Sequence, residues 1–231
     1  MPKRNTSDHN SSQIPTIWLK PIKSPRELPL LTREKIIHAA IHILDEAGLN
    51  GLTIRKLAQQ LNVGPTSLYN HIETRDDVLE LALDSIIGEV AFSNKNLAVE
   101  QALTDFLIEW RRVLLKHIWS ISLLGFKPLI GPNALAHAEH LRSILVRTDL
   151  SISSIIYFEY TLSNFLIGSV VSQVSWQTGN EQEIRNQVAS FITLNAETYP
   201  LLAAHAGNVH DDWDQSFIYG LQGIIRCLIK Q

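Results

Sequence analysis

The residues best suited to chemistry in this sequence form one short run, PTSLYNHI, at Pro65–Ile72. Hydroxyl, phenol, amide and imidazole side chains dominate it, so the segment can add little to a hydrophobic core. Such side chains bind the base edges and phosphate oxygens of double-stranded DNA. If the run is held at a surface, we expect Thr66 and Ser67 to contact bases and Tyr69 and His71 to contact phosphates.

Two helices joined by a tight turn would hold this run in place. A first helix is expected at Thr32–Ala47 and a second at Thr53–Leu61, each begun by a threonine that can cap it. Asn62 tolerates the left-handed backbone that a tight turn needs, and Gly64 followed by Pro65 suits the start of another helix. The pattern predicts a helix-turn-helix whose last, short helix presents its N-terminal end to a DNA major groove.

Two basic residues of the preceding helix, Arg55 and Lys56, lie close enough to reach the DNA backbone or its bases. The competing interpretation is an ordinary helical hairpin whose polar face is solvated. DNA binding is the better supported of the two, because a short polar helix after such a firm break has little to bury.

The rest of the chain is typical of a helical globular protein. Its 231 residues are 45% hydrophobic, enough for one large core or two small ones. The net charge of −3 means that nucleic-acid contacts must come from the local placement of basic groups. A single cysteine, Cys227, excludes an intrachain disulfide and suits a reducing cytoplasm. Further helices are expected at 74–91, 98–119, 133–148, 151–177, 181–199 and 211–229, and no strand pattern is evident.

Three regions follow from these patterns. Residues 1–29 are predicted to form a disordered basic arm, because prolines punctuate a polar segment with five basic and two acidic residues, a net of +3. Residues 30–77 form the predicted DNA-binding head, and residues 78–231 a larger helical body. The arm could add phosphate contacts beside the head, as a homeodomain arm does.

Aromatic and hydrogen-bonding side chains occur on otherwise apolar helices of the body. Such a set can line a mostly apolar cavity with a few polar groups that orient a ligand. The competing interpretation is that most of them are ordinary core residues. The ligand candidates are Phe106, Trp110, His117, Trp119, Phe126, His137, Phe158, Asn164, Phe165 and Trp176.

Metal and membrane roles find little support. His137 and His140 are one helical turn apart, a spacing that can bind zinc, but no third ligand is evident. The apolar stretch 150–174 is about as long as a bilayer span, yet Glu159, Asn164 and several serines interrupt it. A buried helix of a water-soluble bundle is the better interpretation.

Residues 31–83 read LTREKIIHAAIHILDEAGLNGLTIRKLAQQLNVGPTSLYNHIETRDDVLELAL, and this stretch resembles the DNA-binding domain of the TetR (tetracycline repressor) family. Further on, the chain contains LLGFKPLIGPNAL and FIYGLQGIIRCLI, which are similar to the central turn and the last helix of the tetracycline-repressor-like C-terminal domain. The resemblance covers about residues 31–231. It implies an all-α homodimeric repressor of nine or ten helices per chain, whose recognition helices lie roughly 34 Å apart on a palindromic operator.

Matched position by position, the DNA contacts of that family fall on nine residues of this chain. Glu73 stands where the family often has lysine, and residues 30–77 carry five basic and six acidic groups, a net of −1. A head without net positive charge predicts few phosphate contacts and a modest salt dependence. The nine positions are Thr53, Arg55, Pro65, Thr66, Ser67, Tyr69, Asn70, His71 and Arg75.

The resemblance also implies where a ligand and a second subunit bind. The tetracycline repressor holds a magnesium–drug chelate through a histidine and a glutamate, but Leu123 and Ser172 stand at about the matching places. A metal-free, largely apolar effector is therefore expected. A dimer interface of four helices is expected from the two longest apolar helices, although the same residues could form intramolecular core. Its expected residues are Leu162, Leu166, Ser169, Val170, Phe217, Gly220, Leu221, Ile224 and Leu228.

The function that follows is a cytoplasmic homodimeric repressor, released from operator DNA by a small effector and using no cofactor or membrane. The alternative is a DNA-binding regulator without a small-molecule inducer, either an activator or a protein controlled by a partner. An enzyme with an attached helix-turn-helix is disfavoured, because no catalytic triad, phosphate loop or metal cluster is evident. A closed pocket in the body would favour the alternative.

Overall fold

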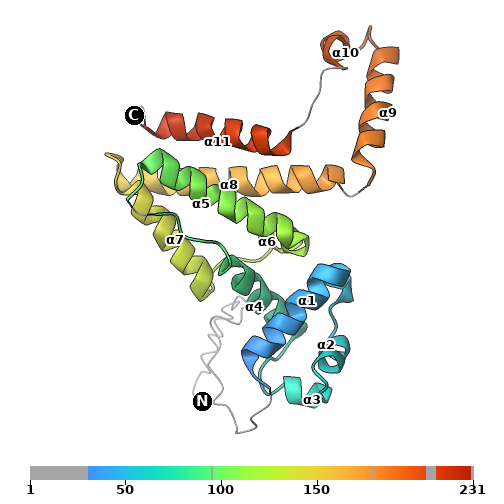
Figure 1. Ribbon diagram of the computed structural model, residues 1–231, viewed down its shortest axis with the longest axis vertical. Coiled ribbons are helices and arrows are strands. Elements are labelled where there is room, and N and C mark those ends of the chain that lie inside the picture. The colour runs from blue at the N-terminus through green and yellow to red at the C-terminus, as the bar shows by residue number, and fades with distance from the viewer. Residues whose placement is uncertain (1–30, 95, 178, 207–211, 230–231) are drawn as a thin grey trace, which may run out of the picture.

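The computed structural model describes residues 31–94, 96–177, 179–206 and 212–229. Within these ranges the chain forms eleven α-helices and one 3-10 helix, η2, and no strand (Figure 1). This confirms the all-α fold. The helices outnumber the nine or ten expected. The additional ones are the short helices α6 (Ile121–Leu124) and α10 (Pro200–His205), which form in segments where no helix was predicted. The predicted arm, residues 1–29, lies outside the described residues.

Three helices form the head, which occupies the lower end of the molecule in Figure 1. They are α1 (Arg33–Gly51), α2 (Ile54–Gln60) and α3 (Pro65–Leu68). Thr32 caps α1 by accepting a hydrogen bond from a backbone amide of its first turn, as predicted. Gly48 takes a positive φ of 62°, which only a residue without a Cβ adopts at little cost, and turns the chain toward α2.

Helix α4 (Arg75–Ile87) joins the head to the body. It packs against α1 on one side and α7 (Pro132–Leu145) on the other, and ten of its 13 residues are buried. Its start is fixed by a capping box, in which the Thr74 hydroxyl accepts from the Asp77 amide and the Asp77 carboxylate accepts from the Thr74 amide. The boundary predicted between residues 77 and 78 falls inside α4, so this helix is shared by the two regions.

The body is built around α8 (Ile152–Gln177), which packs against α5 (Val99–Lys116), α7 and α11 (Trp213–Ile229) (Figure 1). The 3-10 helix η2 (Ile118–Ser120) follows α5 and contacts α1, so head and body meet at a second place besides α4. Within the described ranges, α8 alone has the length and composition to cross a membrane. Its packing against three helices is typical of the central helix of a bundle.

Helices α9 (Glu181–Leu194) and α10 project from one end of α8 (Figure 1). Neither helix contains a buried residue. The base of α9 is nevertheless anchored, because the Arg185 guanidinium carbon lies 4.5 Å from the ring centre of Trp176 and 5.5 Å from that of Trp213. These contacts fix the start of α9 to the C-terminal end of α8 and the N-terminal end of α11.

The seam between α8 and α11 packs within one chain, which is the intramolecular alternative that the sequence left open for the predicted dimer residues. A Cβ on Gly220 would come within 2.8 Å of the Phe165 ring, so this glycine lets the two helices of the same chain approach closely. Ser169 and Ile224 are half-buried, and the side chain of Leu228 lies outside the described residues. Five of the predicted interface residues are already buried within the single chain, namely Leu162, Leu166, Val170, Phe217 and Leu221.

Candidate nucleic-acid interface and ligand core

Local backbone preferences set the start and direction of α3. Thr53 Oγ1 caps α2 by accepting a hydrogen bond from the Lys56 amide at 3.1 Å. Asn62 takes the left-handed conformation with a φ of 52°. Gly64 is extended and Pro65 follows as the first helical residue, where no backbone donor is needed. These features were predicted from the sequence and are confirmed.

Helix α3 is held by its apolar side and exposes its polar side. Leu68 is fully buried and Ile72 is 3% exposed, whereas Tyr69 is 49% exposed. The helix ends at Leu68, and the chain continues as a hydrogen-bonded turn. Of the predicted contact residues in this segment, Pro65, Thr66, Tyr69 and Asn70 are exposed, and Ser67 and His71 are half-buried.

Basic side chains of the head fall into two groups. Arg55 and Lys56 are exposed on α2, as Thr53 is at its start. Arg75 instead donates from Nε to the Leu52 carbonyl at 2.8 Å and from Nη2 to the Leu49 carbonyl at 2.5 Å. It thereby adds a second donor to the Leu49 carbonyl, which already accepts from the Leu52 amide, and ties the C-terminal end of α1 to the start of α4. These hydrogen bonds hold Arg75 against the turn between α1 and α2.

Three of the ligand candidates meet inside the body. Phe106 and Trp110 of α5 place their ring centres 5.8 and 5.6 Å from that of His137 on α7. Phe92, on the connection between α4 and α5, lies 4.6 Å from His137 and 4.7 Å from His140. We call these five residues the ring cluster. Phe92 was not among the candidates, and His140 was considered only as a metal ligand.

The two histidines of the ring cluster differ in their hydrogen bonds. His140 Nε2 lies 3.1 Å from Ser93 Oγ, whereas His137 Nδ1 is buried and has no hydrogen-bond partner. Burial, and then the neighbouring His140, lower the pKa of His137 to about 4. The His137 imidazole is therefore neutral near pH 7, with one ring nitrogen able to donate and the other able to accept.

The rings of the ring cluster pack on one another, with contacting ring centres 4.6 to 6.4 Å apart. A hollow occurs elsewhere in the described part of the chain, between α4, α7 and the connection 127–131. It encloses about 10 Å³, room for a single water molecule. A ligand of the body would therefore have to part the packed rings.

Five other ligand candidates lie outside the ring cluster. Phe126 is 87% exposed, and Asn164 is exposed on α8. Phe165 stacks in the seam between α8 and α11, and Trp176 belongs to the cation–π contact at the base of α9. Phe158 is partly buried against the hydrophobic core. Sequence identifies such residues by type, but it does not show in which direction each side chain points.

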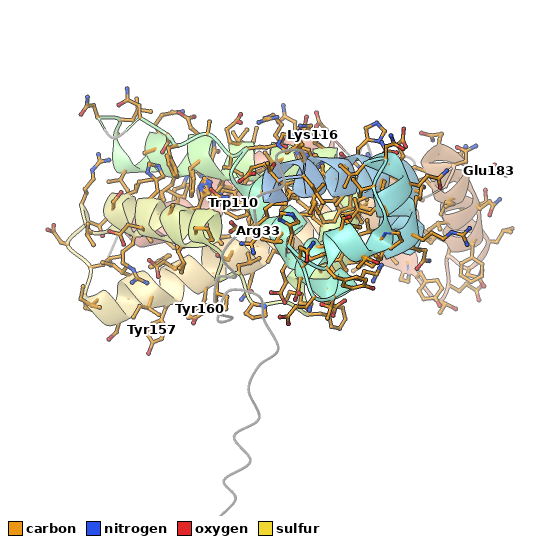
Figure 2. All side chains as sticks on the ribbon, turned by 90° about the horizontal axis from the view of Figure 1, so that it is seen from below. Arg33, Trp110, Lys116, Tyr157, Tyr160 and Glu183 are labelled. Carbon is orange, nitrogen blue, oxygen red and sulfur yellow. The ribbon has the colours of Figure 1, made fainter. Side chains whose placement is uncertain are left out.

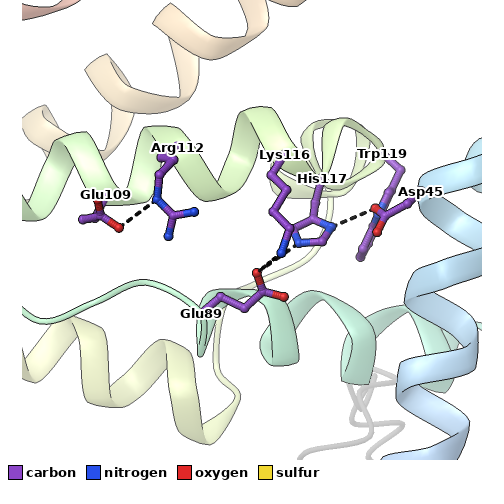
Figure 3. Close-up of polar contacts among 7 residues, drawn as sticks. All are labelled: Asp45, Glu89, Glu109, Arg112, Lys116, His117 and Trp119. Atoms are coloured by element: carbon purple, nitrogen blue, oxygen red, sulfur yellow. Dashed lines mark hydrogen bonds and ion pairs between the residues drawn. The ribbon is translucent and has the colours of Figure 1, made fainter.

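His117 and Trp119, also predicted to bind ligand, join the head to the body instead (Figure 3). Asp45 Oδ1 on α1 accepts a hydrogen bond from Trp119 Nε1 at 2.7 Å and lies 2.8 Å from His117 Nδ1. His117 Nε2 lies 3.3 Å from Glu89 Oε2, which also accepts from Lys116 Nζ at 2.6 Å. We call Asp45, Glu89, His117 and Trp119 the head–body latch.

Because residues of the head–body latch are buried, breaking its hydrogen bonds should destabilise the protein. The His117 side chain is 2% exposed and Trp119 is 5% exposed, so both depend on protein acceptors. Burial alone would raise the pKa of Glu89, but hydrogen bonds from Lys116 and His117 outweigh it and hold this pKa below its ordinary value. Removing Asp45 would leave the buried Trp119 N–H without its acceptor and would take away the partner of His117 Nδ1.

A second connection between α4 and the body runs through Asp84. Its carboxylate accepts hydrogen bonds from the Ala134 amide at 2.9 Å and the Asn133 amide at 3.2 Å, so it caps the start of α7. The same helix, α7, contributes His137 and His140 to the ring cluster. Any shift of α7 that opens the ring cluster would therefore act directly on α4.

Metal ligands do not gather in the described part of the chain. Among the residues with described positions, no three His, Cys, Asp or Glu side chains come together as a possible metal site. Leu123, at the place of the magnesium-binding histidine of the tetracycline repressor, is 7% exposed and apolar, and Ser172 is exposed on α8.

Comparison with known proteins identifies the class of this protein. Residues 36–82 match the family of bacterial regulatory proteins, tetR family, and residues 100–231 match the tetracyclin repressor-like C-terminal domain. The second match alone covers more than half of the chain, so the protein belongs to the TetR family of bacterial transcriptional regulators. This confirms the resemblance seen in the sequence.

Relatives and solved structures agree with this assignment. The chain is 37% identical to an HTH-type transcriptional regulator of Saccharopolyspora erythraea, over 90% of this chain and 89% of that protein. It is 27% identical to the class D tetracycline repressor protein of Escherichia coli, over 85% and 88%. The structure of the TetR family protein ActR of Streptomyces coelicolor, in complex with actinorhodin, superposes with a TM-score of 0.79 at 30% identity, covering 87% of this chain and 96% of ActR.

Proposed function

We propose that this protein is a homodimeric repressor that binds a palindromic operator and leaves it when a small, largely apolar molecule enters the body. The observation that carries the proposal is α3, where buried Leu68 supports a polar, solvent-exposed tip. A tetracycline repressor among the relatives and the complex of ActR with actinorhodin support an effector-released repressor. The protein would act in the cytoplasm as a regulator without catalytic activity.

At the operator, side chains of the tip would divide the work by their chemistry. Thr66 and Ser67 would contact base edges at the N-terminal end of α3, beside Pro65. Tyr69, Asn70 and His71 would bind phosphate oxygens, together with Thr53, Arg55 and Lys56 from α2. Arg75 would contribute indirectly, by fixing the turn on which α2 rests.

The dimer would form through the face of α8 and α11 that points away from the body. This face is exposed and rich in rings and small residues, namely Tyr157, Tyr160, Gly168, Val171 and Tyr219. The side chains of Tyr157 and Tyr160 point outward from α8 (Figure 2). A Cβ at Gly168 would meet nothing within 4 Å, which leaves room for a second chain.

A substitution at Gly168 tests the dimer face. We expect Gly168→Arg to convert the dimer to a monomer in light scattering, with loss of operator binding. The same change at Gly125, which also faces open space at an ordinary backbone φ of −86°, should leave the dimer intact. A Gly168→Arg protein that remains dimeric would place the interface elsewhere.

Release would pass through the contacts that tie the body to the head. A ligand that parts the ring cluster displaces α7, and Asp84 passes this displacement to α4. The head–body latch supplies a second route, from η2 to α1. Because the effector would bind the displaced state more tightly, it would shift the dimer away from operator spacing.

Binding to DNA from the region beside its own gene tests the function. In fluorescence anisotropy, we expect Thr66→Ala and Tyr69→Ala each to weaken binding by about tenfold or more, since one specific contact is worth about 1–3 kcal/mol. Tyr199→Ala is the matched control, because this tyrosine is 40% exposed on the body. Equal losses in all three variants, or no binding by the wild type, would refute the proposed interface.

A second candidate function rests on the closed interior of the body. The rings around His137 fill the space that an effector would occupy, which favours a DNA-binding regulator without a small-molecule inducer. A panel of small aromatic and aliphatic compounds separates the two candidates. Release of the operator by one of them supports the effector-controlled repressor, and a protein that binds its operator but responds to none supports the second candidate.

A further inference from the structure

The ring cluster contains a buried polar atom that has no hydrogen-bond partner among the described residues. His137 is 3% exposed, and its Nδ1 has no hydrogen-bond partner, although the neighbouring His140 is bonded to Ser93. Buried side-chain polar atoms are nearly always hydrogen-bonded, and an exception demands an explanation. A ligand that supplies the missing partner is one.

We propose that the ring cluster binds a neutral, planar aromatic molecule of two or more fused rings, with a hydroxyl group hydrogen-bonded to His137 Nδ1. The inference rests on the proposed function, because it names the chemical class of its effector. It assigns the effector to contacts from α5, α7 and the connection between α4 and α5.

Ring geometry favours an aromatic ligand over an aliphatic one. The contacts of the cluster are tilted or edge-to-face, the arrangements in which aromatic rings attract one another beyond simple area burial. Phe92 lies outside any helix and is 54% exposed, yet its inner face packs on both imidazoles. A planar ligand can replace Phe92 on these imidazoles and keep the same ring contacts.

Charge favours a neutral hydroxyl as the polar group of the ligand. Since burial keeps His137 neutral near pH 7, Nδ1 either donates or accepts, and a hydroxyl can match either tautomer. The ring cluster and Ser93 include no carboxylate to pair with a cation and no Lys or Arg to pair with an anion. Burying an unpaired charge there would cost far more than burying a hydroxyl.

Three naphthalene derivatives of similar size test the proposal by calorimetry on the full-length protein at neutral pH. We expect 2-naphthol to bind about three- to tenfold more tightly than 2-methylnaphthalene, the difference made by one neutral hydrogen bond, and 2-naphthoate to bind more weakly than 2-naphthol. His137→Phe should abolish the preference for the hydroxyl while retaining affinity for 2-methylnaphthalene. His137→Asn, which keeps a polar atom near the Nδ1 position, should retain part of the preference.

The same measurement on His38→Phe is the control, since His38 is exposed on α1. Melting curves of all variants show whether the body stays folded. Equal affinity for naphthol and methylnaphthalene, tightest binding of naphthoate, or an undiminished preference in His137→Phe would each overturn the inference. If another compound still released the operator, the proposed function would stand without it. Absence of binding by every probe would overturn the inference as well.

Discussion

The head and the body differ in how completely their polar groups are satisfied. In the head, Thr53 and Thr32 cap their helices, and Arg75 covers the carbonyls at the end of α1. Among the described residues, three buried side-chain polar atoms lack a partner, namely Arg111 Nε, Ser120 Oγ and His137 Nδ1, and all three lie in the body. The head holds α3 on a support without unpartnered buried side-chain atoms among the described residues. In the body, a bound ligand could supply hydrogen-bond partners that are missing.

The unpartnered atoms of the body are not equivalent. Arg111 donates from its other nitrogens to Asp214 at 2.6 Å and to Gln173 at 2.5 Å, so its side chain is fixed between α5, α8 and α11. His137 has ring contacts, but its Nδ1 forms no hydrogen bond with any described residue. A single added group at His137 would supply a missing hydrogen-bond partner and also contact α7, whereas the remaining unpartnered atom, Ser120 Oγ, lies in η2 outside the ring cluster.

The strongest test of the head as a support for α3 is Leu68→Ala. Leu68 is fully buried beneath the exposed tip, so we expect a loss of about 2–5 kcal/mol in the free energy of unfolding, the usual cost of such a cavity. Urea denaturation measures it. The adjacent change Tyr69→Ala should alter stability by less than about 0.5 kcal/mol, because about half of this residue is exposed. Similar stability losses at both positions would mean that α3 is packed differently.

The next largest effect concerns the body and depends on pH. His137 has a folded pKa of about 4, below its unfolded value of about 6.5, so folding favours the neutral form. Its contribution is fully present above pH 6.5 and is lost as pH falls toward 4, by up to about 3 kcal/mol. His137→Gln should flatten the loss of stability in this window, measured by urea denaturation from pH 7 to pH 4.5. His38→Gln, at an exposed position, should leave the wild-type profile unchanged.

The features that the sequence predicts correctly are local ones. The caps of α1 and α2, the left-handed Asn62 and the proline start of α3 depend on groups within a few residues, so local rules identify them. The direction of a body side chain depends on distant partners. His117 meets Asp45 from 72 positions away, and nothing around His117 in the sequence distinguishes a latch residue from a ligand contact.

Helix phase shows the same limit in the dimer seam. Spacing by three and four correctly marks one face of α8 and one of α11 as apolar, but that face packs within the chain, as Leu162 and Leu221 show. The outward face carries Tyr157, Tyr160 and Gly168, a mixture of rings and small residues without a strong periodic signal. The unsatisfied Nδ1 of His137 is likewise visible only once its neighbours are in place.

The head–body latch joins the two regions and should show an intermediate effect. Asp45→Ala leaves the buried Trp119 N–H without an acceptor and removes the partner of His117 Nδ1, so we expect a loss of about 1–3 kcal/mol in unfolding free energy. Asp45→Asn keeps a side-chain oxygen and should lose less. In the proposed repressor, Asp45→Ala should also reduce the change in operator affinity that an effector produces, because one of two routes is cut. A variant with wild-type stability and full effector response would show that the latch carries neither role.

The smallest expected effect asks whether the head is sufficient on its own. Residues 30–77 carry a net charge of −1, and residues 1–29 carry +3, so the arm would provide much of the positive charge near the phosphates. Deleting residues 1–29 should weaken operator binding at low salt and reduce the slope of log affinity against log salt by about 1–3, since each neutralised phosphate adds about 0.9. Stability should not change. Equal affinity with and without the arm, at both low and high salt, would show that α2 and α3 provide all the contacts and that the head binds through shape and hydrogen bonds more than through charge.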